Sequence, residues 1–405
     1  MRVVVIGSGI VGAAAACYLS RRGAKVTVVE AGYPGAATPA SAGIVCPWVD
    51  HAEDDAWYHL TREGARRYPG LVGELGEDIG YAKVGALLVA EEPADLEPVR
   101  GLLRRRYDEA PEMGEVTDVT TPAELFPPLS DSLSALLVPG AARVDGDAVR
   151  EALLRAALEG GAEVRTGAAR LSPAGEVFVH TTSAVEDGEA CPLPEEQTHE
   201  EAGSWRQSRP LDPAAPQPHA VTAARRLTGE GVPIEADAVV VAAGAWTGEV
   251  CRPLGVELPV FPRRGQILHV CMEGVDTAWW PIILPRNGPY LLGFTDSRIV
   301  IGATVEDVGF APRVTMGGLG EVIEAGLRTA PGLYNATVAE TRVGLRPVYA
   351  PGPALIGPVT GRVVVATGLS AYGLTAGPFT GAVAADLVLG ETPPIDITPY
   401  APPIP

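Results

Sequence analysis

The chain is poor in lysine and shows no pattern of cysteine or histidine that is typical of a metal site. Lys25 and Lys83 are the two lysines among 31 basic residues, so chemistry that requires a lysine has only two candidates. The five cysteines include no CxxC pair, and the six histidines show no metal-ligand spacing. We therefore expect neither a disulfide framework nor a metal site. The simplest compartment for such a chain is the cytoplasm.

The chain also lacks a positive charge balance and a long apolar run. Its formal net charge is −19, which argues against nucleic acid as a partner and against docking to an anionic membrane surface. No uncharged apolar run reaches the roughly 20 residues that a membrane helix needs, so we expect no transmembrane segment. Three glycines interrupt the apolar N-terminus at fixed spacing, so a signal peptide is not expected there.

What remains is the composition of an ordinary globular protein. The chain has 405 residues, of which 46% are hydrophobic and 20% are charged. This length is enough for a large core and for two domains. The first thirty residues read as a strand at 2–7, a helix of small residues that ends at Gly23, and a second strand at 25–30. This order is a complete βαβ unit.

A glycine motif lies at the first strand-to-helix turn. Gly7, Gly9 and Gly12 form a GxGxxG pattern, and Glu30 ends the second strand. The glycines allow a tight turn, close approach of a pyrophosphate to the backbone, and helix–strand packing; the acid can accept from ribose hydroxyls. The pattern in this context predicts dinucleotide binding. It does not distinguish NAD from FAD, because the same physics serves both.

A second glycine-rich turn lies near the C-terminus, within "ATGLSAYGLTAGPFTG" at 366–381. It separates a buried strand from a helix, so Gly373, Leu374 and Thr375 could present amides to the ring of a flavin. A packed glycine turn without a ligand explains the same residues equally well.

Segments of two kinds alternate along the chain and predict an α/β protein, α+β overall, with two interleaved domains. Long buried strands and amphipathic helices, such as the helix that begins near Asp145, suggest a Rossmann-type nucleotide-binding domain. Shorter alternating strands suggest a second domain with a mostly antiparallel sheet. The predicted bounds are 1–80, 140–250 and 335–400 for the first domain, and 81–139 and 251–334 for the second. An acidic, proline-rich stretch at 186–218 predicts a low-complexity insertion at about 173–218.

Seven stretches together resemble the flavin-dependent D-amino acid oxidase superfamily, in particular its glycine oxidase and D-amino acid dehydrogenase branches. They follow the family order from residue 2 to about 390, and the insertion has no counterpart. The stretches are "VVVIGSGIVGAAAACYLSRRGAKVTVVE", "TPASAGIVCP", "ADAVVVAAGAWT", "RRGQILHV", "IVIGATVEDVGF", "GLRPVYAPGPALIGP" and "VVVATGLSAYGLTAGPFTGAVAADLV".

The resemblance implies that the cofactor is FAD and that the first domain is an FAD-binding domain. Members that attach their flavin through a cysteine carry it in the segment that matches 344–349, where this chain has none, so the FAD is expected to be non-covalent. The implied cofactor-binding residues are Gly7, Gly9, Ile10, Val11, Gly12, Glu30, Ala31, Ser41, Ala42, Gly43, Gly244, Gly373, Leu374 and Thr375.

Two arginines lie four residues apart in "ETRVGLRP", which reads as extended because Pro347 disfavours helix for the residue before it. Arg342 and Arg346 would then share one face of a strand. From the residues alone, Arg346 could equally bind a substrate anion or pair with a protein acid. The resemblance implies that Arg346 binds a substrate carboxylate, that Tyr290 helps to line the substrate pocket, and that Arg342 has a structural role.

The resemblance implies oxidation of the Cα–N bond of a small amino acid, which is glycine, a D-amino acid or an N-substituted glycine. Hydride passes to flavin N5, and the resulting imine hydrolyses. Oxygen or an electron carrier then accepts the electrons. Val300 stands where sarcosine-oxidase-like members have a lysine near the flavin, which argues against a copy of that branch. Three alternative functions remain: a dehydrogenase that uses a quinone or protein acceptor, a 2-hydroxy acid oxidase, and a non-catalytic FAD-binding subunit. The chain could also form a homo-oligomer.

Overall fold

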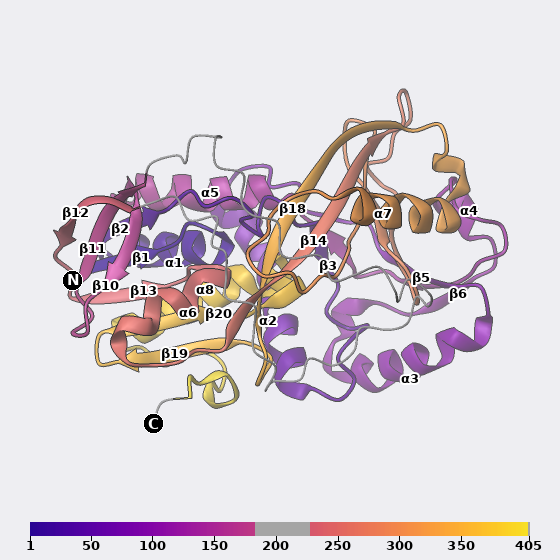
Figure 1. Ribbon diagram of the computed structural model, residues 1–405. Coiled ribbons are helices and arrows are strands. Elements are labelled where there is room, and N and C mark those ends of the chain that lie inside the picture. Colours follow the sequence, from indigo (N-terminus) through magenta and orange to yellow (C-terminus); the bar gives the residue numbers. More distant parts are fainter. Residues whose placement is uncertain (183–226, 404–405) are drawn as a thin grey trace.

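Figure 1 shows the computed structural model, which describes residues 1–182 and 227–403. One half of the molecule is built on a six-stranded sheet with the strand order β19-β20-β13-β1-β2-β9. Its strands are parallel except for the antiparallel pair β19–β20. The bounds are Arg2–Ile6 (β1), Lys25–Glu30 (β2), Glu163–Thr166 (β9), Ala238–Val241 (β13), Leu355–Thr360 (β19) and Val363–Thr367 (β20).

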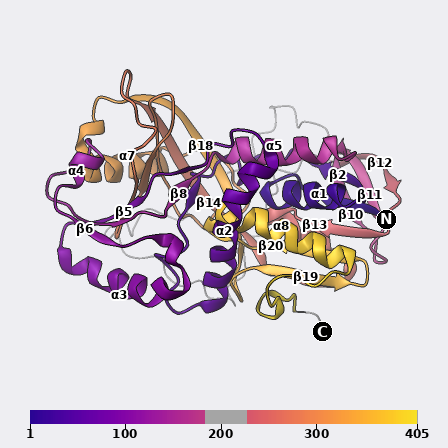
Figure 2. The ribbon, with the colours of Figure 1, turned by 180° about the vertical axis from the view of Figure 1, so that it is seen from behind.

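Three helices cover one face of this sheet, as the view from behind in Figure 2 shows. They are α1 (Ile10–Arg21), α5 (Gly146–Glu159) and α8 (Gly373–Leu389). Small residues allow α1 and α8 to pack closely: a Cβ on Gly381 would lie 2.5 Å from the Cβ of Ala14 and 2.6 Å from the carbonyl oxygen of Val11. The alanine run of α1 is therefore a packing surface. The longer helix α2 (Asp55–Leu75) packs against α8 from outside.

The other face of the six-stranded sheet is covered by a small antiparallel sheet and a short helix. The elements are β10 (Ala168–Leu171), β11 (Val177–Thr182), β12 (Leu227–Ile234) and α6 (Thr247–Cys251). The inner strands β1, β13 and β20 of the six-stranded sheet are covered on both faces, so they form the nearly continuous apolar runs seen in the sequence.

The other half of the molecule is built on an eight-stranded sheet with the order β18-β14-β17-β16-β15-β5-β7-β6. All pairs are antiparallel except β15–β5. Helix α3 packs on one face, and α7 packs with the short α4 on the other. The bounds are Ala86–Ala90 (β5), Thr117–Val119 (β6), Ser134–Val138 (β7), Val260–Cys271 (β14), Ile282–Pro285 (β15), Tyr290–Gly293 (β16), Arg298–Gly302 (β17), Thr337–Tyr349 (β18), Glu97–Arg106 (α3), Pro122–Leu125 (α4) and Met316–Thr329 (α7).

The predicted fold class is confirmed, but two observed strands differ from the predicted bounds. Strand β18 pairs along its length with β14 of the eight-stranded sheet, although 335–400 was assigned to the FAD-binding domain. Strand β11 falls within 173–218, where a low-complexity insertion was predicted. Its Val177 is buried in the core next to the six-stranded sheet, so this part of the range is an ordered strand. The acidic stretch at 186–218 lies outside the described residues, and the other domain bounds stay a prediction.

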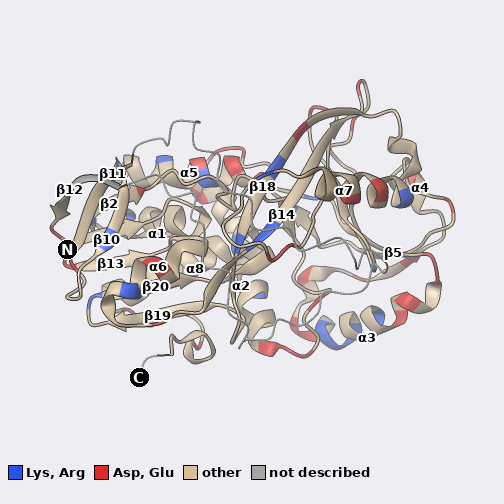
Figure 3. Cartoon of the chain, in the orientation of Figure 1, with Lys and Arg blue, Asp and Glu red and all other residues tan. Residues whose placement is uncertain are grey.

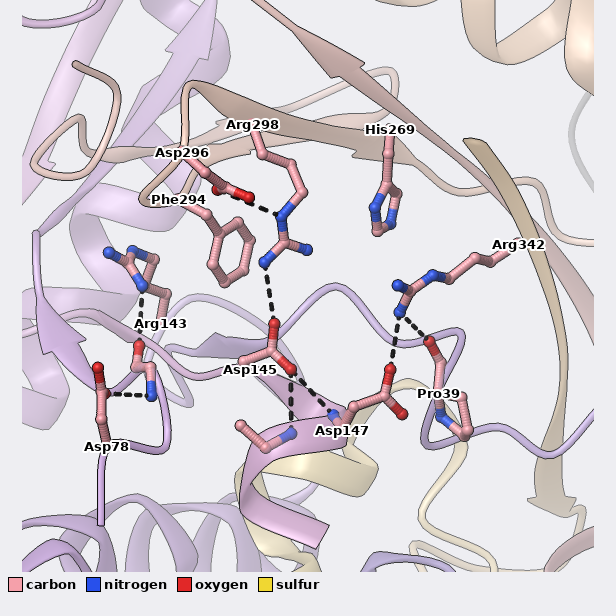
Figure 4. Close-up of polar contacts among 12 residues, drawn as sticks. Pro39, Asp78, Arg143, Asp145, Asp147, His269, Phe294, Asp296, Arg298 and Arg342 are labelled. Carbon is pink, nitrogen blue, oxygen red and sulfur yellow. Dashed lines mark hydrogen bonds and ion pairs between the residues drawn. The ribbon is translucent and has the colours of Figure 1, made fainter. Parts of the chain in front are cut away.

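A cluster of charged side chains joins the two halves where α5 begins (Figure 4). Asp145 caps α5, which begins where the sequence predicts a helix, and also accepts a hydrogen bond from Arg298 of β17 at 2.9 Å. Arg342 of β18 donates to Asp147 of α5 at 3.0 Å and to the carbonyl of Pro39 at 2.8 Å. A second small sheet of β3 (Ile44–Val45), β4 (Ala82–Lys83) and β8 (Ala142–Arg143) lies beside this junction. In the described part of the chain, no helix has the length and apolar character needed to cross a bilayer.

Candidate active site

A cavity of about 580 Å³ runs from the first glycine turn to the paired strands β14 and β18. Segments that are far apart in the sequence line it together. Fourteen of the predicted site residues are among the lining residues: Gly7, Gly9, Ile10, Val11, Glu30, Ala31, Ser41, Ala42, Gly43, Gly244, Tyr290, Arg346, Gly373 and Leu374.

Two predicted residues, Gly12 and Thr375, are not among the lining residues. A Cβ on Gly12 would lie 1.9 Å from the carbonyl oxygen of Gly7, so the glycine lets α1 approach the turn closely. The buried Thr375 hydroxyl donates to the carbonyl of Ile44 at 2.9 Å. This hydrogen bond joins α8 to β3, which directly follows the loop 38–43. Both residues shape the walls of the cavity from behind.

The first glycine turn is held by a set of hydrogen bonds around Ser8. Gly7 has φ +100°, where a side chain would be strained. The Glu30 carboxylate accepts from the Ser8 amide at 2.9 Å and from the Gly32 amide at 2.8 Å. Arg150 of α5 donates to the Ser8 carbonyl at 2.6 Å and to its hydroxyl at 2.7 Å. The turn and the acid at the end of β2 are thus oriented together.

The loop 38–43 forms the next part of the wall. The amide of Ile10 at the start of α1 donates to the Thr38 hydroxyl at 3.0 Å, and the Ser41 hydroxyl donates to the Thr38 carbonyl. Gly43 has φ +97°, and a Cβ there would lie 1.9 Å from the Val144 carbonyl oxygen. The loop is therefore pressed between α1 and the segment that leads into α5.

The start of α8, which lies near the C-terminus in the sequence, lines the same cavity. Gly373 and Leu374 line the cavity at the first turn of the helix, where amides lack intrahelical partners. The buried hydroxyl of Tyr68 donates to the Leu374 carbonyl at 2.6 Å. This helix end is fixed from behind by α2.

Arg346 extends from β18 into the wall of the cavity beside Tyr290. Its Nη1 donates to the carbonyl of Thr304 at 3.0 Å and to that of Arg264 at 3.3 Å. In the described ranges, no carboxylate forms an ion pair with Arg346. Burial lowers the pKa of its guanidinium. Burial also raises the pKa of Tyr290, so its hydroxyl stays protonated. A protonated phenol and a cation without a carboxylate partner are suited to an anion.

Arg342, four residues earlier on the same strand, is placed differently. It donates to Asp147 and to the carbonyl of Pro39, as Figure 4 shows, and also to Glu340 at 2.9 Å. It is not among the residues that line the cavity. These contacts agree with the structural role that we predicted for Arg342.

Sequence reasoning missed many of the lining residues, among them Tyr33, Trp246 and Gly265. The Tyr33 and Trp246 rings lie 5.5 Å apart on the cavity wall. Gly265 is a glycine inside the strand "RRGQILHV", which is a signal for close approach of another group. Among described residues, no group of three or more metal-ligating side chains was found.

A Rossmann-type sheet and two glycine turns that meet at one cavity define a dinucleotide-binding protein. The family model "FAD dependent oxidoreductase" matches residues 2–192 and 212–387. The chain therefore belongs to this family, which confirms the D-amino acid oxidase superfamily and identifies an FAD-dependent enzyme of glycine oxidase type.

Individual relatives match along the whole chain. The uncharacterized oxidoreductase YurR of Bacillus subtilis (strain 168) is 38% identical, with 98% of each chain covered. Glycine oxidase of Pseudomonas aeruginosa is 30% identical, covering 99% of this chain and 98% of the relative. The crystal structure of iminodiacetate oxidase from Chelativorans sp. BNC1 is 39% identical, has a TM-score of 0.84 and is covered over 99% of each chain.

The residues of the cavity fit FAD. A Cβ at Gly7 would lie 2.5 Å from the carbonyl oxygen of Ala242, and the Glu30 carboxylate stands beside the glycine turn. These groups would hold the adenosine diphosphate half, and the start of α8 would meet the flavin. The roles of the individual residues, non-covalent attachment and cytoplasmic localisation stay predictions.

Proposed function

We propose that this enzyme oxidises the Cα–N bond of a small amino acid, with glycine and N-substituted glycines as the favoured substrates and D-amino acids next. The observation that carries the proposal is Arg346, a guanidinium in the cavity wall with no protein carboxylate paired to it among the described residues. Guanidinium binds carboxylates through two parallel hydrogen bonds and keeps its charge.

The side chains around Arg346 support a small substrate. Gly265, Gly344 and Ala371 line the cavity together with Tyr290, so several wall positions carry little or no side chain. Two relatives, a glycine oxidase and an iminodiacetate oxidase, are named for amines that carry carboxymethyl groups. We infer that the chain takes the same class of compound.

The chain's own part in the reaction is binding and orientation. Arg346 holds the substrate carboxylate, Tyr290 flanks it, and the small wall residues leave room for Cα and the amine nitrogen. FAD, when bound, supplies the acceptor for the hydride that leaves Cα. The substrate becomes an imine after loss of a hydride and a proton, and water hydrolyses the imine to an oxo acid and an amine or ammonium.

An anaerobic screen for bleaching of the flavin absorbance tests this proposal. We expect bleaching by glycine, N-methylglycine, iminodiacetate or D-alanine, with release of amine or ammonia, and none by glycolate. Bleaching by glycolate alone would identify a 2-hydroxy acid oxidase. Bleaching by none of these compounds would contradict the proposal. Comparison of turnover with oxygen and with an artificial acceptor then separates an oxidase from a dehydrogenase.

Arg346→Met tests the role of the arginine. We expect kcat/KM to fall at least about 30-fold with FAD retained, because loss of one partner of a buried charge pair costs about 2 to 5 kcal/mol. Arg263→Met is the matched control, because Arg263 lies opposite Arg346 in the β14–β18 register but pairs with Asp307 at 2.8 Å. An Arg346→Met variant with unchanged KM would remove the assignment.

A further inference from the structure

A network of buried polar groups lies directly behind Arg346, and its centre is Glu306. The carboxylate of Glu306 accepts from the Gln266 side-chain amide at 2.7 Å and from the Thr304 hydroxyl at 2.7 Å. It also forms an ion pair with Arg264. Gln266, Thr304 and Arg264 are 2%, 1% and 4% exposed, so these donors have little access to water. Removal of the carboxylate would leave the Thr304 hydroxyl without its acceptor, while the Gln266 amide would keep the Thr315 hydroxyl and Arg264 would keep the Ala311 carbonyl.

The same residues present the carbonyls that hold Arg346. The segment at 304–306 is joined to β14 by hydrogen bonds in both directions: Glu306 N to Arg264 O at 3.0 Å, Arg264 N to Glu306 O at 2.8 Å, and Gln266 N to the Thr304 hydroxyl at 2.9 Å. The Arg346 Nη1 bonds to Thr304 O and Arg264 O, one carbonyl on each side of this junction. The position of the guanidinium therefore depends on how the two segments are joined.

Gly265 supplies the space that the guanidinium occupies. A Cβ at this position would lie 2.4 Å from Nη1, 2.4 Å from Nη2 and 2.5 Å from Cζ of Arg346. Such nearly equal distances place the missing side chain over the face of the guanidinium. The atoms nearest to an added Cβ are thus all at the movable end of Arg346, so we expect the substitution to displace the guanidinium.

We propose that Glu306 is a positioning residue that holds Arg346 in its carboxylate-binding orientation. We also propose that Gly265 is required because the absence of a side chain there leaves room for the guanidinium. The inference rests on the proposed function of Arg346. Glu306 acts through the carbonyls of Thr304 and Arg264 and has no contact with substrate. Its neighbour Asp307 makes no such link, because it pairs with Arg263 at the surface.

The test measures binding of acetate to the FAD-loaded enzyme through the change in flavin absorbance. Acetate carries the carboxylate and has no C–N bond to oxidise. We expect Glu306→Gln and Gly265→Ala each to raise the Kd of acetate roughly 10- to 100-fold, since a small misplacement of a binding group has effects of this size. Asp307→Asn removes the same charge one residue away and is expected to leave Kd within twofold.

A double-mutant cycle distinguishes positioning from a general structural effect. If Glu306 acts through Arg346, then Glu306→Gln adds nothing to the loss already caused by Arg346→Met. Losses that add in the double variant, or wild-type Kd in both single variants, overturn the inference. Should Glu306→Gln fail to fold, Glu306→Asp, which keeps the charge and shortens the side chain, takes its place in the cycle, and Gly265→Ala tests the space under the guanidinium separately.

The same titrations separate this inference from the proposed function. If Arg346→Met binds acetate as tightly as the wild type, or if acetate does not perturb the wild-type flavin, the role of Arg346 itself is wrong. If Arg346→Met weakens binding and the Glu306 and Gly265 variants do not, the role of Arg346 stands and the positioning network is wrong.

Discussion

Replacement of Asp145 by alanine removes one carboxylate that performs two tasks. One oxygen accepts from the amides of Asp147 and Ala148, both at 3.1 Å, and so caps α5. The other accepts from Arg298 of β17 at 2.9 Å and so joins α5 to the eight-stranded sheet (Figure 4). The variant therefore loses a helix cap and a contact between the two halves of the molecule.

The expected loss is the sum of these two contributions. A lost N-cap costs about 1 kcal/mol. The Arg298 and Asp145 side chains are 23% and 26% exposed, so their pair is only partly screened and contributes about 1 to 2 kcal/mol. We expect Asp145→Ala to lower the free energy of unfolding by about 2 to 3 kcal/mol in urea titrations followed by circular dichroism.

Two further variants separate the contributions. Asp54 caps α2 through the Trp57 amide at 2.9 Å and forms no ion pair in the described part, so Asp54→Ala should cost only the cap. Asp145→Asn keeps a capping oxygen and should lose only the ion pair. A loss in Asp145→Ala no larger than that in Asp54→Ala would refute the reasoning.

The pH dependence gives an independent check of the ion pair. Burial acts to raise the pKa of Asp145, but the Ala148 amide and Arg298 outweigh burial and lower the pKa. The stabilisation is therefore complete above the ordinary pKa of an aspartate and is lost as the pH falls through the lowered value. The difference between wild type and Asp145→Ala should shrink over that acidic range.

In Figure 3, red lies toward the start of α3 and blue toward its end, in agreement with Glu97 in the first turn and three arginines in the last turn. Three buried positions give further predictions. Gly12→Ala should yield protein without FAD, read from the flavin absorbance, because the new Cβ meets the Gly7 carbonyl oxygen, whereas Gly70→Ala meets nothing within 4 Å and should retain FAD. Tyr68→Phe should lower the free energy of unfolding by about 1 to 3 kcal/mol, because the buried Leu374 carbonyl loses its donor; an unchanged urea midpoint would contradict this. Burial lowers the pKa of His269 to about 4, so the wild type should lose about 3 kcal/mol as the pH falls from 6.5 to 4, and His269→Leu should lack this part of the loss.

The sequence alone was sufficient for the features that depend on neighbouring residues. The βαβ opening, the glycine turn before α1 and the start of α5 near Asp145 follow from spacing and residue type, because each is set by contacts within a few turns of chain. The ordered set of motifs also identified the family, which the match over 2–192 and 212–387 confirms.

Only the tertiary structure could distinguish Arg342 from Arg346. The two residues lie on the same face of one strand, so the two-residue repeat of the strand predicts the same orientation for both side chains. Arg342 meets Asp147 and the carbonyl of Pro39, whereas Arg346 meets two backbone carbonyls and the cavity.

The same limit applies to Gly265 and to β18. Gly265 matters because the side chain of Arg346, which is distant in the sequence, lies against it. Strand β18 belongs to the eight-stranded sheet because its partner is β14. Local patterns determined which segments become strands and helices and where a dinucleotide binds. Long-range pairing determined which side chains lie against that cofactor site, because contacts between distant segments leave no periodic trace in either segment.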